Sequence, residues 1–161
     1  MRPEPDELLQ SLRTSLAETI VPAIDDRWAR YVATAMDLVL QHLQLRLAGE
    51  FDALSADNAD MARTLGALAA DVGRRANAYP PVVDALAPLP EPGPATDLAS
   101  VTSVNEALRG QVVALLQALD RVARDPVVER WRDEVLRLVR RQVDRVNPLV
   151  APLHMSFGPT A

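Results

Sequence analysis

The chain has 161 residues, a formal net charge of −5, a pI near 5.0 and no cysteine, so thiol catalysis, disulfides, iron–sulfur clusters and cysteine zinc sites are excluded. All 17 basic residues are arginine, which also excludes Schiff-base lysines and the lysines of phosphate-binding loops. The acidic charge disfavours nucleic-acid binding, and no apolar run reaches the roughly 18 residues of a membrane span. We therefore expect a soluble, cytoplasmic protein that binds neither nucleic acid nor membranes.

Helical periodicity dominates the first half of the chain. Residues 5–20 carry leucines at every fourth position, which predicts an amphipathic helix. Residues 23–48 have one narrow polar stripe and are otherwise apolar, a pattern typical of a buried helix. We expect this segment to be the central helix and to stop at Gly49. A third helix is predicted over residues 51–77, with an interruption at Asn58.

Prolines mark the boundary between two helical halves. Four prolines alternate between Pro88 and Pro94 in the connector 80–99, which predicts an extended polyproline segment that either joins the halves or docks into an aromatic groove. Two helices are predicted in residues 100–147, and the second begins at Asp125-Pro126 because Asp caps a helix and Pro suits its first position. The tail 148–161 is apolar, so we expect it to lie in a groove.

These segments predict an all-α fold, a four- to five-helix bundle built as a single domain over residues 1–161. Its halves are residues 1–79, with three helices, and residues 100–147, with a helical pair. No segment alternates apolar and polar residues as a half-buried strand does. The proline-rich crossover joins the two halves.

His42 and Arg46 are the candidate ligand-binding residues. His42 lies at the edge of the apolar side of segment 23–48, and Arg46 projects toward that side one turn later. His42 is interpreted either as a hydrogen-bonded structural residue or as a ligand or base. Arg46 either extends its charge to solvent or forms a polar pocket with His42. No Glu-x-x-His or His-x-x-x-His motif occurs, and we predict no catalytic residue, metal ligand or cofactor.

Two charged patterns leave alternatives open. Asp57 and Asp60 are three residues apart and share a helix face, as paired carboxylates do in metal-dependent hydrolases, although acidic residues also suit a first helical turn. On the last helix, one face carries several arginines, which indicate either a phosphate or acidic-partner surface or a solvated face interleaved with carboxylates. These arginines are Arg130, Arg137, Arg141 and Arg145.

Two stretches resemble a small all-helical bacterial domain of unknown function. One is Arg2-Pro3 with Glu7-Leu8-Leu9 and Val21-Pro22-Ala23-Ile24, and the other is Asp125-Pro126 with Val143-Asp144-Arg145-Val146-Asn147-Pro148. The likeness covers residues 2–48 and 125–148, while the helix near 101–124 is additional to it. Genes for that domain tend to lie beside aminoglycoside-phosphotransferase-like kinases and acyl-CoA dehydrogenases. The resemblance implies an accessory role near acyl or phosphoryl transfer and carries no catalytic residues.

Three functions remain compatible with the sequence. The first is a non-enzymatic helical accessory or interaction protein that self-associates as a homodimer or other homo-oligomer, or binds another protein. The second is a binder of a hydrophobic or acyl ligand in the bundle interior, with His42 or Arg46 as the polar anchor. The third is a carboxylate metal-dependent hydrolase. The excess of apolar helix surface and the lack of catalytic motifs favour the first.

Overall fold

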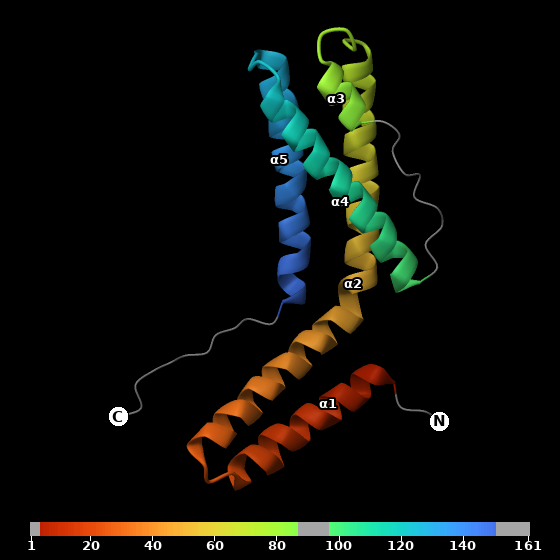
Figure 1. Ribbon diagram of the computed structural model, residues 1–161. Helices are drawn as coiled ribbons and strands as arrows, with labels where there is room; N and C mark the ends of the chain where they lie inside the picture. Colours follow the sequence, from red (N-terminus) through yellow and green to blue (C-terminus); the bar gives the residue numbers. More distant parts are fainter. Residues whose placement is uncertain (1–3, 87–96, 151–161) are drawn as a thin grey trace. The chain divides into compact units, whose positions relative to one another are not determined.

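A computed structural model describes residues 4–86 and 97–150, and every regular element within these ranges is helical (Figure 1). The predicted all-α class is thereby confirmed. The helices are α1 (Pro5–Ser15), the π-helical turn η1 (Leu16–Ile20), the 3-10 turn η2 (Val21–Ala23), α2 (Arg27–Gly73), α3 (Pro80–Ala85), α4 (Leu98–Arg121), α5 (Pro126–Val146) and the 3-10 turn η3 (Asn147–Leu149). Within the described ranges, no helix has the length and apolar character needed to cross a membrane.

Acidic caps define where α2, α4 and α5 begin. Asp26 accepts a hydrogen bond from the backbone N–H of Ala29 at 2.7 Å at the start of α2. Asp97 accepts one from Ser100 at 2.7 Å and starts α4. Asp125 accepts two at the start of α5, whose first residue is a proline, as the sequence predicts. Each carboxylate satisfies N–H groups that have no partner inside the helix and also complements the helix dipole.

Helix α2 is longer than predicted, because it continues through the expected stop at Gly49 and the expected interruption at Asn58. No residue in the described ranges has a positive φ, so Gly49 does not form a left-handed cap. Glu50 instead pairs with Arg46 across one turn of continuing helix. Asn58 is tolerated because its side chain donates to the carbonyl of Val101 at 2.9 Å.

The proline-rich connector is shorter than the predicted span 80–99. Pro80 and Pro81 occupy the first turn of α3, where a missing N–H removes no helical hydrogen bond, so they begin a helix and do not prevent one. At the other end, α4 begins at Leu98. The expected polyproline conformation between residues 87 and 96 and the docking of tail residues 151–161 lie outside the described residues.

The chain separates into two compact units, and the division falls inside α2, between Glu50 and Phe51. The sequence predicts instead one domain with its halves joined at the proline-rich stretch. The first unit contains residues 1–50 and 146–161, and the second contains residues 51–145. Within the first unit, α1 and the beginning of α2 lie side by side as a helical hairpin (Figure 1).

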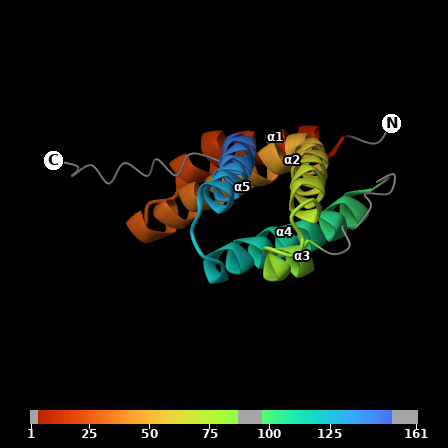
Figure 2. The same cartoon turned by 90° about the horizontal axis from the view of Figure 1, so that it is seen from above.

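The second unit holds the hydrophobic core. Fifteen buried apolar residues form one cluster contributed by the end of α2, α3, α4 and α5. Trp131 is its largest member; its ring meets Tyr79 edge-on at 5.0 Å, and its indole N–H donates to Asp71 at 2.8 Å. Viewed from above, α4 passes across the second part of α2 and α5 (Figure 2). This unit therefore has the interior that a stable domain of its size requires.

Candidate interaction surface

Polar side chains hold the hairpin of the first unit together. The guanidinium of Arg13 on α1 donates from Nε to Asp37 of α2 at 2.9 Å and from Nη1 to Gln44 at 3.2 Å. Gln44 in turn donates to Gln10 at 3.5 Å. Asp37 and Gln44 belong to the narrow polar stripe of segment 23–48. These polar contacts join α1 to one edge of this part of α2.

The prediction that segment 23–48 is a buried central helix is wrong. Among the described residues of the first unit, only Leu16 and Ala33 are buried hydrophobics. Large apolar side chains follow α2 at spacings of three and four residues and are 41–71% exposed. With two exposed residues of α1 and η1 they form what we call the apolar face: Leu12, Ile20, Trp28, Val32, Met36, Val39, Leu43 and Leu47.

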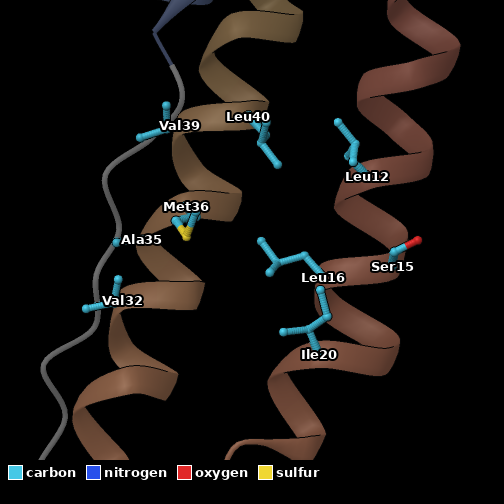
Figure 3. A pocket seen from close by; sticks show the side chains of 9 residues that line it. All are labelled: Leu12, Ser15, Leu16, Ile20, Val32, Ala35, Met36, Val39 and Leu40. Carbon is cyan, nitrogen blue, oxygen red and sulfur yellow. The ribbon is translucent and has the colours of Figure 1, made fainter.

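A cleft of about 530 Å³ opens within this hairpin (Figure 3). Leu16 and Ile20 point into it from one helix and Leu40 from the other, whereas the hydroxyl of Ser15 points away. Five members of the apolar face line the cleft. They are Leu12, Ile20, Val32, Met36 and Val39. The lining contains no charged side chain, so the cleft offers shape and apolar contact but no group for acid–base chemistry.

His42 and Arg46, the sequence-predicted ligand residues, lie one turn apart on α2, and neither lines the cleft. His42 is half-buried and Arg46 is exposed. Arg46 donates from Nε to Glu50 at 3.1 Å, and this hydrogen bond raises the pKa of the guanidinium. An ion pair with its neighbour one turn later thus accounts for Arg46, while a ligand-binding role for His42 and Arg46 stays a prediction.

In the second unit, the carboxylates of Asp57 and Asp60 are buried and lie on one face of α2, as predicted. Arginines of α5 occupy them: Arg145 donates to Asp57 at 2.6 Å and to Asp60 at 2.9 Å, and Arg141 donates to Asp60 at 2.8 Å. The hydrogen bond from Arg141 holds the pKa of Asp60 below its ordinary value, with Arg145 acting in the same direction against the effect of burial. Both oxygens of Asp60 and Oδ1 of Asp57 therefore already accept charged hydrogen bonds, whereas Oδ2 of Asp57 is buried without one and lies 3.8 Å from Arg109.

A third acidic centre in the second unit was not foreseen from the sequence. Asp71 accepts hydrogen bonds from Trp131 at 2.8 Å, Arg74 at 2.8 Å and Arg130 at 2.5 Å. The bond from Trp131 is the main reason that the pKa of Asp71 is lowered, and the two arginines add to it. Among the described residues, no group of three or more histidines and carboxylates is placed to hold a metal ion.

Comparison with known proteins adds no family to this description. No family model matches the chain, and no curated protein or solved structure is significantly similar to it. The apolar face and the acidic centres are therefore the features of the chain that bear on its function.

Proposed function

We propose that the protein is a non-enzymatic helical interaction protein of the cytoplasm that self-associates through the apolar face of its hairpin. The observation that carries the proposal is the exposure of large apolar side chains along α2. Its polar residues Asp37 and Gln44 contact α1, while Val39 and Leu47 are 60% and 62% exposed. Exposure of such a contiguous apolar surface to water is unfavourable. Surfaces of this kind are typical of interaction sites.

A second copy of the chain is the partner that fits this face best. Approach between copies is opposed by their charge of −5 each, so contact is favoured where a surface carries no charge, as on the apolar face. Two hairpins packed face to face form a four-helix arrangement with an apolar interior, and a twofold axis allows the same patch to serve both copies.

The apolar area is sufficient for such a dimer. Each of the eight side chains is roughly half exposed, so covering it contributes about 1 kcal/mol. Two copies together gain about 16 kcal/mol, which exceeds most estimates of the 4–15 kcal/mol cost of association. The described residues of the first unit include two buried hydrophobics, and association adds apolar burial to this small interior.

Light scattering coupled to size-exclusion chromatography tests the proposal. The full chain is expected to elute with the mass of a dimer, or of a larger even-numbered oligomer. The double variant Met36→Glu/Leu47→Glu is expected to be a monomer because it places like charges on both sides of the interface. The matched control Val113→Glu/Val143→Glu changes two exposed apolar residues of the second unit and should keep the wild-type mass. A monomeric wild-type chain at high concentration would overturn the proposal.

The cleft supports a second candidate, the binding of a hydrophobic or acyl ligand. A volume of about 530 Å³ lies within the range of small-molecule sites, and the lining of leucine, isoleucine, valine and methionine suits an alkyl chain. A fluorescent fatty acid distinguishes the two: saturable binding by a monomer, abolished by Leu16→Asn, favours the ligand, and absence of binding removes this candidate. The metal-dependent hydrolase gains no support, because arginines occupy Asp57 and Asp60.

A further inference from the structure

A groove in the second unit lies between α2 and α5. Its residues come later in the chain than those of the apolar face, and several of its side chains are charged. It consists of two cavities of about 400 and 390 Å³, which adjoin each other because they share Thr64, Ala67 and Glu134 in their walls. Its overall size is that of a small-molecule site.

The groove is strongly basic although the chain is acidic. Six arginines line it, three in each cavity: Arg74, Arg130 and Arg137 in the first, and Arg63, Arg141 and Arg145 in the second. Three carboxylates accompany them: Asp60, Asp71 and Glu134. With Asp57, which pairs with Arg145 without lining either cavity, six arginines face four carboxylates, which leaves a formal charge of +2 in a chain whose net charge is −5. A face of simple ion pairs does not require such an excess.

The carboxylates hold the arginines in place without using all their donors. Asp60, which is 3% exposed, accepts hydrogen bonds from Arg63 at 3.1 Å, Arg141 at 2.8 Å and Arg145 at 2.9 Å. Three guanidinium groups thus converge on one buried carboxylate. Each guanidinium has five N–H donors, so donors remain for a bound anion after these bonds are made. Fixing the side chains beforehand lowers the entropy cost of binding.

We infer that this groove binds a small molecule that carries two or more phosphate groups. A phosphate presents oxygens in a tetrahedral arrangement, and arginines that approach from two helices can reach it from several directions. Two adjoining cavities with three arginines each suit linked phosphates better than a single anion. This inference goes beyond the proposed self-association and rests on the other unit of the chain, so either can fail alone.

Isothermal titration calorimetry of the full chain at physiological salt tests it, with sodium tripolyphosphate as the probe. We expect saturable binding with one site per chain, weaker binding of inorganic phosphate, and competition by ATP. The double variant Arg63→Gln/Arg137→Gln removes one exposed arginine from each cavity and leaves Arg141 and Arg145 on Asp60. Its affinity should fall at least about tenfold, because hydrogen bonds between charged groups are lost.

The control is Arg121→Gln/Arg140→Gln, which changes the net charge equally at two exposed arginines that do not line the groove. It should keep the wild-type affinity within about twofold, because neither side chain lines the groove and no hydrogen bond to the anion is lost. Equal losses in both double variants would show that diffuse charge alone attracts the anion, and this would overturn the inference. An absence of saturable heat with tripolyphosphate would overturn it as well. Circular dichroism confirms that both variants retain the helical fold.

Discussion

Replacing Val39 by alanine gives a quantitative test of the apolar face without adding a charge. Val39 is 60% exposed, and the change removes two of its carbon atoms. At about 0.8 kcal/mol for each buried carbon, covering 60% of them contributes about 1 kcal/mol per chain. A twofold dimer contains the site twice, so the dimer loses about 2 kcal/mol, and its dissociation constant rises roughly 30-fold.

Sedimentation equilibrium measures this dissociation constant directly, with Val113→Ala as the matched control. Val113 is 53% exposed on α4 of the second unit, so its replacement should leave the constant unchanged within about twofold. Alanine favours helix more than valine does, so loss of helix cannot explain weaker association of the Val39 variant. Equal dissociation constants for wild type and Val39→Ala would refute the reasoning, whatever the control does.

Three further predictions concern the second unit. The folded-state pKa of Asp60 lies below its unfolded value, so the stability that it contributes is complete above about pH 4 and is lost as the pH falls through the folded pKa. In urea unfolding, Asp60→Asn should therefore cost about 1–3 kcal/mol at pH 7 and much less in strong acid, and an equal cost at both would contradict the ion-pair account. Tyr79→Phe removes the hydroxyl that donates to Asp125 at 2.7 Å, so NMR titration should show the pKa of Asp125 rising toward its ordinary value. Gly110→Ala should raise the free energy of unfolding by about 0.5–1 kcal/mol by calorimetry, because no atom lies within 4 Å of the added Cβ; a loss would refute this.

Capping residues and apolar periodicity predicted those helices whose limits depend on residues close together in the chain. The helix that follows Asp125-Pro126 begins where the cap and the proline place it, since both act on the first turn alone. The amphipathic segment 5–20 is likewise helical through α1 and η1. The stop at Gly49 failed because glycine weakens a helix by about 1 kcal/mol, which continuing hydrogen bonds and the pair of Arg46 with Glu50 offset.

The apolar face and the basic groove could not be predicted from local patterns. Burial and ion pairs involve residues that lie far apart in the chain. Periodicity shows that one side of segment 23–48 is apolar, but it does not show whether another helix covers that side. The arginines of α5 were recognised from their spacing, whereas Arg63 of α2 and Arg74, which follows the end of α2, were not. The ion pair from Arg145 to Asp57 joins residues 88 apart in sequence, a relation that no local pattern records.

The paired asparagines of the second unit have a consequence for how its helices align. Asn105 donates to Asn58 at 2.8 Å, and both side chains are buried. Leucine and valine contacts tolerate sliding of one helix along another, since one apolar side chain resembles the next. A slip of one turn would instead leave both amides in a dry interior without partners, at a cost of about 1–3 kcal/mol each. The pair thus fixes the register of α4 on α2, as a single buried asparagine does in coiled coils.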